Sequence, residues 1–439
     1  MFEGECLMLV NFKFKNFKSF YNENDLSLQA TKDDELKEIN TFSVDEKLFN
    51  KTEEHELLKS AIIFGGNASG KSNIIKGLTY MYNVIRLSSA QQFSNIVKSN
   101  EYYAFYENAY NEPSLYEVEI ITNGNLYKYG FTILHEKIEK EWLYKRNERT
   151  SIVFERIKNK IKLTGNETIQ SLINVPETTL FLSIGVNFNL SISRHLKDVI
   201  DWFNNLIIVF ENNVNSLDIY SVENQKYKNL AMEILNKADI GIKNMNVVKD
   251  KVADLRDLNA VLAFNMQLQA NLNKYGQLKQ ENENMYNIDL DTQFDVYNDK
   301  NEKVATKDIM LFKDRGFHSE GTTRLLCYLG YILAALDKGK VILIDEVDSK
   351  LHFLVADYLL KMFNSIDKNP NNAQLICTAH NVMLMDDDLR RDQIYFTSKD
   401  KYGVSSLVSL ADYKGVRKND LFSKKYLAGF YAKLPNLNR

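Results

Sequence analysis

Gly65-Gly66-Asn67-Ala68-Ser69-Gly70-Lys71-Ser72 is the stretch that decides the fold, because it fits the pattern G-x-x-x-x-G-K-S without a mismatch. A short apolar run, Ala61–Phe64, precedes it and is typical of a buried strand, and the segment Ser72–Leu87 that follows is typical of a helix. In this setting glycines let the backbone wrap a phosphate chain, while backbone N–H groups and the helix N-terminus face its oxygens. The sequence therefore predicts a phosphate site formed by Gly65, Gly66, Asn67, Ala68, Ser69, Gly70, Lys71, Ser72 and the adjacent Asn73.

Chemistry at this site needs a lysine, a metal and a base. Lys71 is expected to reach the β- and γ-phosphates, and the Ser72 hydroxyl to ligate Mg²⁺. The apolar run Val341–Ile344 ends in two acids. At the carboxyl end of a buried strand, Asp345 would face the metal and Glu346 would polarise the water that attacks the γ-phosphate. These residues predict a Mg²⁺-dependent nucleoside triphosphatase, and by themselves they fit ATP and GTP equally.

Patterns along the chain predict an α/β fold with an antiparallel β subdomain. Turn dipeptides at Asn123-Gly124 and Lys158-Asn159 separate alternating segments and indicate two hairpins. After residue 308, helical and strand-like segments alternate, which indicates a mostly parallel, covered sheet. The expected helices there are Thr323–Leu336 and Lys350–Phe363, and the expected strands are Lys340–Ile344, Gln374–Thr378 and Gln393–Thr397.

A large insertion separates the two halves of the site, since Lys71 and Asp345 are 274 positions apart. From about Ile192 to Asn287 the pattern favours helix, including a Gln/Asn-rich amphipathic stretch from Val261 to Asn284. The sequence therefore predicts an N-terminal lobe over 1–185, an inserted, mainly helical region over 186–307 and a C-terminal lobe over 308–439. A helical arm and plain core packing both fit the Val261–Asn284 stretch.

Composition excludes several classes of protein. The 439 residues are 44% hydrophobic and 26% charged, which is ordinary for a globular chain, and the net charge of −3 gives no global basic field. Residues 390–439 carry eleven basic and four acidic side chains, so a solvated basic face and a polyanion or partner surface both stay open. Three cysteines without metal-ligand spacing, no signal peptide and no apolar run of about 18 residues point to the cytoplasm and away from membranes. Met1 and Met8 both fit as the native start.

The order of the remaining motifs resembles the ABC-type ATPases of the SMC, RecF and OLD group. Ser319-Glu320-Gly321-Thr322-Thr323-Arg324 looks like a divergent signature motif, Asp348-Ser349 like the D-loop, and His380 like the switch histidine. The resemblance implies ATP as the nucleotide and a split ATPase head that works as a head-to-tail dimer. It also implies that Ser319 and Gly321 of one subunit close over the nucleotide held by the other. Gln91 and Gln92 lie too close to the phosphate loop to serve as the Q-loop residue.

A narrower likeness is to the bacterial defence ATPases of the AbiL/RloA and AriA type. It departs at Phe430 and Ala432, where that group would have Arg and Gly. It implies an ATP-driven regulatory subunit of an antiphage system with a separate effector, a nuclease or toxin; higher homo-oligomers and nucleic acid stay open. The residues that carry it are Asn16–Phe20, Phe64–Asn73, Tyr127–Phe131, Arg390–Ile394 and Tyr426–Tyr431.

Two other functions compete with the defence role. A self-contained nuclease with a C-terminal Toprim domain is disfavoured, because only 59 residues follow His380 and such a domain needs about a hundred. A RecF- or SMC-like DNA-repair ATPase stays as the alternative, although the insert is too short for the heptad arms of a long SMC protein.

Overall fold

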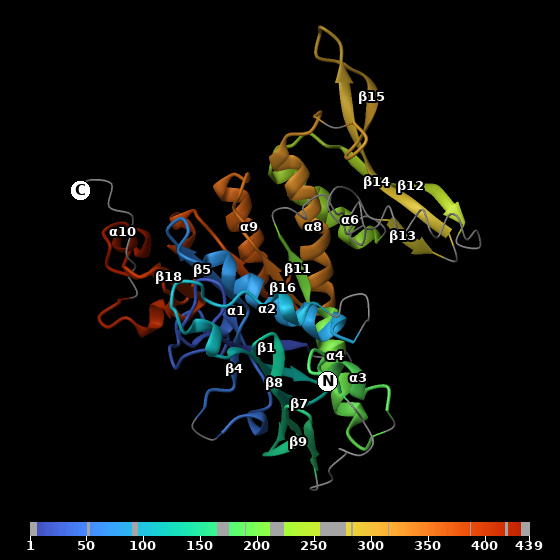
Figure 1. Ribbon diagram of the computed structural model, residues 1–439. Helices are drawn as coiled ribbons and strands as arrows, with labels where there is room; N and C mark the ends of the chain where they lie inside the picture. The colour runs from blue at the N-terminus through green and yellow to red at the C-terminus, as the bar shows by residue number, and fades with distance from the viewer. Residues whose placement is uncertain are drawn as a thin grey trace. The chain divides into compact units, whose positions relative to one another are not determined.

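The computed structural model describes residues 7–50, 53–89, 95–164, 175–188, 190–210, 224–254, 278–281, 284–314, 316–386, 388–417 and 420–431. The chain divides into two compact units (Figure 1). The first comprises Met1–Ile208, Lys338–Ser349 and Asp357–Arg439, and the second Val209–Asp337 and Lys350–Ala356. The lobe boundaries at residues 185 and 307 remain predictions from the sequence. Among the described residues no helix is both long and apolar enough to cross a membrane.

A mostly parallel sheet of six strands carries the phosphate loop. Its order is β11 (Ile207–Val209), β16 (Val341–Ile344), β17 (Gln374–Thr378), β5 (Ser60–Gly65), β18 (Ile394–Lys399) and β19 (Ser405–Ser409). β16, β17, β5 and β18 pair in parallel, and β19 pairs antiparallel with β18. Every residue of β16 and β17 is buried, as expected for strands covered on both faces. The predicted α/β fold is confirmed.

An antiparallel sheet of seven strands forms the other layer of the first unit. Its order is β10 (Lys160–Leu163), β9 (Arg149–Ile157), β8 (Lys137–Asn147), β7 (Asn125–Leu134), β6 (Ser114–Thr122), β1 (Met8–Lys15) and β2 (Asn24–Ser27). Asn123 and Gly124 turn between β6 and β7 with φ of 48° and 70°, the left-handed conformation that a tight hairpin requires. Both predicted hairpins are therefore present, and β8 joins them into one sheet.

Helix α2 (Lys71–Leu87) packs between these sheets, since it contacts β5 and β17 of one and β6 of the other (Figure 1). Gly77 of this helix faces β1, since a Cβ placed on it would make ordinary van der Waals contact with the Phe12 ring at 3.4 Å. The first unit also contains α1 (Lys37–Asn40), α3 (Phe181–Gly185), α4 (Ser193–Asn205), α10 (Phe422–Leu427) and most of α9 (Phe353–Asn364). Short 3-10 helices are η1 (Glu46–Leu48), η3 (Val97–Ser99), η4 (Ala109–Asn111), η7 (Val382–Met385), η8 (Arg391–Gln393) and η9 (Leu410–Asp412).

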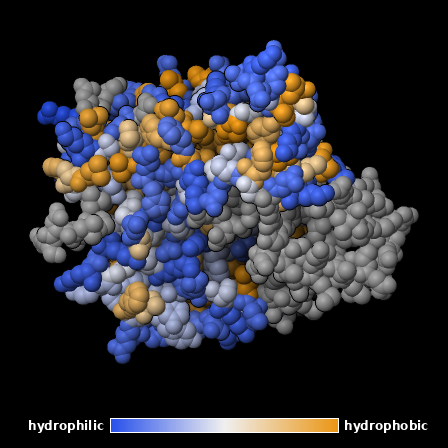
Figure 2. Space-filling view, turned by 90° about the horizontal axis from the view of Figure 1, so that it is seen from above, coloured by the Kyte–Doolittle hydropathy of each residue, from blue (hydrophilic) through white to orange (hydrophobic). Residues whose placement is uncertain are grey.

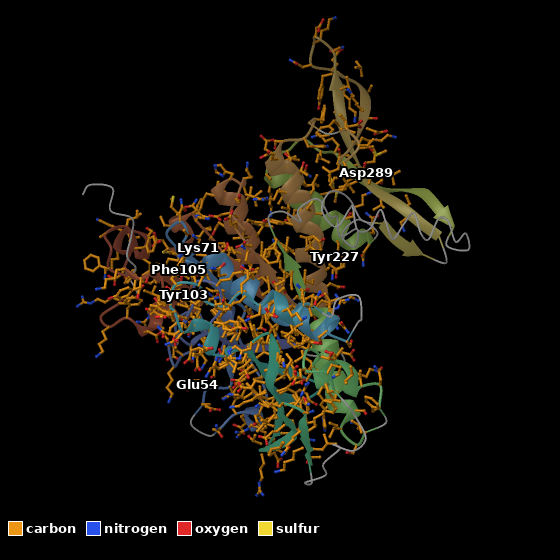
Figure 3. The ribbon with its side chains drawn as sticks, in the orientation of Figure 1. Glu54, Lys71, Tyr103, Phe105, Tyr227 and Asp289 are labelled. Carbon is orange, nitrogen blue, oxygen red and sulfur yellow. The ribbon has the colours of Figure 1, made fainter. Side chains whose placement is uncertain are left out.

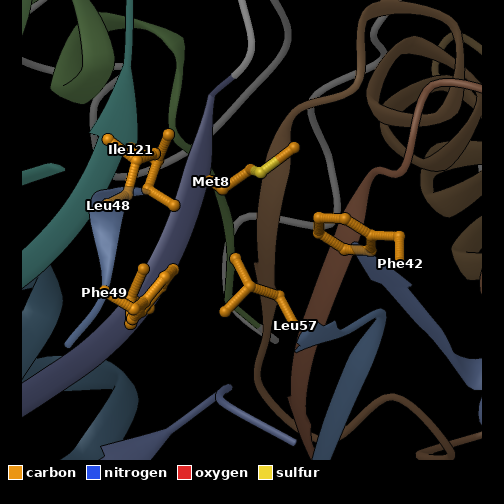
Figure 4. Packing of buried hydrophobic residues seen from close by; sticks show 7 residues of the cluster. Met8, Phe42, Leu48, Phe49, Leu57 and Ile121 are labelled. Atoms are coloured by element: carbon orange, nitrogen blue, oxygen red, sulfur yellow. The ribbon is translucent and has the colours of Figure 1, made fainter. Parts of the chain in front are cut away.

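Side chains from distant parts of the sequence tie β1 to the hairpin β3 (Thr41–Ser43) and β4 (Glu56–Leu58). Figure 4 shows the buried cluster of Met8, Val10, Phe42, Leu48, Phe49, Leu57 and Ile121. Beside it, the buried Gln374 amide accepts from Leu9 N at 2.7 Å and donates to Leu58 O at 3.0 Å. Figure 2, which views the molecule from above, shows hydrophilic residues interspersed with apolar ones on that surface.

The second unit corrects the prediction of a mainly helical insert. Its helices among the described residues are α6 (Gln225–Lys237), which lies within the predicted insert, and α8 (Glu320–Lys338), which follows it. Its strands β12 (Asn244–Asp254), β13 (Leu278–Glu281), β14 (Asn284–Tyr297) and β15 (Lys303–Met310) form a sheet around β14, shown in gold and yellow-green in Figure 1. From Tyr286 to Val296 apolar or β-branched residues alternate with Asn, Asp and Gln, a period of two that indicates a strand. Of the Gln/Asn-rich stretch, Val261 to residue 277 lies outside the described residues.

A buried polar network occupies the Arg390–Gln393 motif. The Arg390 guanidinium is 1% exposed, donates to both oxygens of Asp392, and also donates to Asp33 O at 2.7 Å. Asp392 in turn accepts from the backbone N–H of Thr31 at 2.8 Å. Arg390 is therefore engaged inside the molecule and adds nothing to an outer basic face.

Arg390→Ala should lower the free energy of unfolding by about 3–5 kcal/mol, because it leaves the Asp392 carboxylate buried without its cation. Urea denaturation measures this. Arg391→Ala is the matched control: Arg391 pairs with Asp33 on side chains that are 31% and 26% exposed. Such a part-exposed pair should contribute at most about 1 kcal/mol. Equal losses in the two variants would contradict the assignment of Arg390 as the buried anchor.

Candidate functional site

The phosphate loop connects β5 to α2, and close packing fixes its glycines. A Cβ on Gly65 would lie 2.2 Å from Thr397 Oγ1 and 2.7 Å from Thr397 O, so no side chain fits there. Gly70 caps α2 with φ of 112°, and a Cβ on it would lie 2.7 Å from Ser405 Oγ. Ala68 is also left-handed, with φ of 59°. The loop therefore adopts the curved backbone that its sequence pattern predicted.

Three hydroxyl groups from neighbouring segments, those of Thr397, Ser405 and Ser19, hold this loop and the start of α2. Ser69 Oγ lies 2.5 Å from Thr397 Oγ1 of β18, and Ser69 O accepts from Ser405 Oγ of β19 at 2.7 Å. Ser19, in the turn between β1 and β2, lies 2.8 Å from Ser405 Oγ through its own hydroxyl. Asn73 donates its side-chain amide to the same Ser19 Oγ at 2.8 Å. Asn73, a predicted nucleotide ligand, thus supports the loop in this structure.

Lys71 lies within the loop at the start of α2 (Figure 3). Its Nζ donates to Gly65 O at 2.8 Å and to Gly66 O at 3.3 Å, and the residue is only 6% exposed. Burial lowers the pKa of this ammonium, while the negative charges of Glu346, Asp345 and Asp348 oppose that shift and raise it. The structure therefore brings the predicted lysine and the predicted acids together.

Asp345 and Glu346 follow directly on β16. Asp345 is 7% exposed and accepts a hydrogen bond from Thr378 Oγ1 at 2.7 Å. Glu346 is half-buried, and its backbone is left-handed with φ of 56°. Its side chain approaches His380, with Oε1 3.4 Å from Nε2. The acidic pair and the predicted switch histidine are thus neighbours.

Asp348, the predicted D-loop residue, contacts the segment that follows β17. Its carboxylate accepts from the backbone N–H of His380 at 2.9 Å and of Asn381 at 2.5 Å, in the same chain. These bonds tie the segment after β16 to the segment after β17. Asp348 therefore fixes the backbone beside His380, whereas its part in nucleotide binding as the D-loop residue stays a prediction.

Ser319 and Gly321 begin helix α8 in the second unit. Ser319 Oγ accepts from Thr322 N at 3.1 Å, which caps the helix. A Cβ on Gly321 would lie 2.5 Å from Lys350 O, so the glycine permits a close approach of the chain. Ser319 is exposed and Gly321 is half-buried, and Glu320 between them pairs with Lys350 at 2.6 Å.

The sequence did not predict Thr378, Thr397 and Ser405 as residues of the site. Thr378 contacts the acids, and Thr397 and Ser405 contact the loop. A threonine near the end of each strand beside β5 was the available signal. The terminal motif that supported the narrower resemblance packs internally, because Tyr426 and Tyr431 stack on Phe396 at 5.3 and 5.4 Å. Gln91, Gln92 and Ala432 lie outside the described residues.

A metal at this site would rely on few protein ligands. Among the described residues, no group of three or more His, Cys, Asp and Glu side chains is arranged to hold an ion. Mg²⁺ in nucleotide sites is held by one or two protein oxygens together with phosphates, and the Ser72 hydroxyl and the Asp345 carboxylate are donors of that kind. The donor set therefore fits Mg²⁺ bound with a nucleotide.

Comparison with known proteins assigns the family. The family model described as "AAA domain, putative AbiEii toxin, Type IV TA system" matches residues 60–386, from the phosphate loop past His380. The chain belongs to this AAA-domain family. It is thus a P-loop ATPase, as the phosphate-loop motif indicated; the resemblance to ABC-type ATPases and the AbiL/RloA and AriA likeness stay predictions.

Individual relatives of this family member are distant. A protein named "ATP/GTP phosphatase" from Helicobacter pylori (strain ATCC 700392 / 26695) is 25% identical over 342 residues, which cover 76% of this chain and 82% of that protein. Among solved structures, the Smc head domain of Pyrococcus furiosus, bound to the C-terminal domain of ScpA, matches at 13% identity with a TM-score of 0.38. That match covers 92% of this chain and 96% of the other.

Proposed function

We propose that this AAA-domain family member hydrolyses ATP with Mg²⁺ in the cytoplasm, at a site built on the phosphate loop and the Asp345-Glu346 pair. The observation that carries the proposal is the buried Lys71 ammonium, which lies within the glycine loop and is acted on by three carboxylates of the second half-site. Such an arrangement suits a phosphate chain bearing a cation. The printed name of the Helicobacter relative supports the same reaction.

In this proposal each residue of the site has a separate role in binding or hydrolysis. Lys71 and the loop N–H groups bind the β- and γ-phosphates, and Ser72 and Asp345 hold Mg²⁺, which neutralises phosphate charge. Glu346 takes a proton from water as the water oxygen bonds to the γ-phosphorus and the bond to the β–γ bridging oxygen breaks, giving ADP and phosphate. His380, 3.4 Å from Glu346, is placed to orient that carboxylate.

The signature residues would complete the site of a second subunit. Ser319 and Gly321 lie at a helix start, where N–H groups and the helix dipole favour anions. The family resemblance supports their use across a head-to-tail dimer, and the exposure of Ser319 and Glu320 is compatible with it. An isolated monomer would then hydrolyse ATP poorly.

Ser319→Arg should retain ATP binding, because the phosphate loop is untouched, yet block turnover. Lys71→Ala should also be inactive, but because it no longer binds ATP. If the site is shared between subunits, mixing these two inactive variants restores one complete site in each mixed dimer. Random mixing should then recover about a quarter of the wild-type ATPase rate.

Lys71→Ala mixed with Glu346→Gln is the matched control. Both changes disable the half-site that one chain contributes, so this mixture should stay inactive. Absence of recovery in the first mixture, with all variants folded, would show that Ser319 does not act across a dimer.

The biological role we propose is the regulatory ATPase of an antiphage system with a separate effector, a nuclease or toxin. The resemblance of five sequence segments to defence ATPases and the family's description as a type IV toxin–antitoxin protein support it. The test is purification of the tagged chain from its host together with phage challenge. A stoichiometric nuclease or toxin and loss of protection in Lys71→Ala would support the role, and repair proteins with DNA would favour the RecF-like alternative.

A further inference from the structure

Thr378 is the last residue of β17 and lies next to both catalytic acids. It is fully buried, and its single hydroxyl makes two hydrogen bonds. Oγ1 donates to Asp345 Oδ1 at 2.7 Å, and it accepts from the backbone N–H of Glu346 at 2.7 Å. One hydroxyl thus joins the predicted metal ligand to the predicted base.

We propose that Thr378 is a positioning residue for ATP hydrolysis, which sets the Asp345 carboxylate and the Glu346 backbone in one arrangement. The proposal rests on the function proposed above. Thr378 is not itself a catalytic residue, because it acts through the two acids.

The first bond orients the Asp345 carboxylate. The Thr378 hydroxyl donates to Oδ1, and this bond restricts rotation of the carboxylate about the Cβ–Cγ bond. Groups that orient a metal ligand in this way influence metal affinity and activity by about 10- to 100-fold when they are removed. The Asp345 side chain is buried, so water has little access to replace the lost hydroxyl.

The second bond holds a backbone conformation that ordinary residues avoid. Glu346 has φ of 56°, which is unfavourable for a side chain with a Cβ and occurs at functional sites where the surroundings enforce it. The Thr378 hydroxyl accepts the Glu346 N–H, Thr378 O accepts Val347 N at 3.0 Å, and Glu346 O accepts Ser349 N at 3.0 Å. Removing the hydroxyl eliminates the bond from Glu346 N. The turn that orients the Glu346 side chain can then relax to a more favourable backbone conformation.

The test uses Thr378→Val, which keeps the shape of the side chain and replaces the hydroxyl by a methyl group. Steady-state ATP hydrolysis should show kcat lowered by about 10- to 100-fold. KM should change little, because the phosphate loop keeps its own contacts. Binding of a fluorescent ATP analogue should still occur without Mg²⁺, but the tightening caused by Mg²⁺ should be smaller than in the wild type.

Two further variants separate positioning from folding. Thr378→Ser keeps the hydroxyl and should restore kcat to near the wild-type value. Thr132→Val is the matched control: Thr132 is a buried β7 threonine whose hydroxyl has no partner among the described residues, so kcat should not change. Wild-type kcat in Thr378→Val, or an equally poor Thr378→Ser, would overturn the proposal. If the wild type and Thr132→Val also have no ATPase activity, the proposed function itself is refuted.

Discussion

Glu346→Gln should lower the rate of ATP hydrolysis by about 10²- to 10⁴-fold, the usual contribution of a general base. The amide cannot take a proton from water, whereas the Asp345 carboxylate and the phosphate loop are unchanged. ATP should therefore still bind with Mg²⁺, and the variant should accumulate as an ATP-bound dimer. Hydrolysis assays measure the rate, and light scattering with and without ATP measures the dimer.

Asp345→Asn provides the contrast for this variant. It should also hydrolyse slowly, but because it loses a charged metal ligand its ATP binding should no longer depend strongly on Mg²⁺. If Glu346→Gln hydrolyses ATP at the wild-type rate, Glu346 is not the general base. The assignment of Asp345 as a metal ligand would be unaffected.

Lys71→Ala should abolish measurable ATP binding and turnover. The ammonium is poised to make charge-assisted hydrogen bonds to phosphate oxygens, each contributing about 1.5–3 kcal/mol. Loss of two such bonds weakens binding by roughly 10²- to 10⁴-fold. Equilibrium titration with a fluorescent ATP analogue measures the affinity.

Lys59→Ala is the matched control for Lys71→Ala. Lys59 is also buried, at 3% exposure, and burial lowers the pKa of its ammonium too, but its Nζ donates to Ile39 O. Its removal should lower stability without a specific loss of ATP affinity. If both variants lose ATP binding equally while staying folded, the special role of Lys71 is wrong.

Several elements of the fold could be read from the sequence because their signals are local. Asn123-Gly124 specifies a tight hairpin by its backbone preference, and the apolar runs before Gly65 and Asp345 specify buried strands. The alternation from Tyr286 to Val296 was equally local, yet this segment fell within the region 186–307 that was predicted to be mainly helical. β14 pairs with β12, β13 and β15, contacts between segments that no single stretch reveals.

Charge counts along the sequence were less informative than the contacts. The excess of basic residues from Arg390 onward was compatible with a solvated basic face and with a surface for a polyanion or partner. In the structure Arg390 is buried against Asp392, and Arg391 pairs with Asp33, a residue more than 350 positions away in the chain. The Arg391–Asp33 pair therefore neutralises part of that local excess, whereas Asp392 was already counted against it, and both pairs favour a structural use of those charges.

The sequence by itself determined the phosphate loop and the place of the acidic pair, because G-x-x-x-x-G-K-S and the apolar strand followed by Asp345-Glu346 are contiguous motifs whose local structure depends little on the rest of the chain. Only the tertiary structure decided how these groups are held. The order β16-β17-β5-β18 places the ends of parallel strands side by side, so Thr378 reaches Asp345 and Thr397 reaches Ser69. A hydroxyl on one strand acquires a role only when its neighbour is known, since strand order is set by packing across the whole sheet.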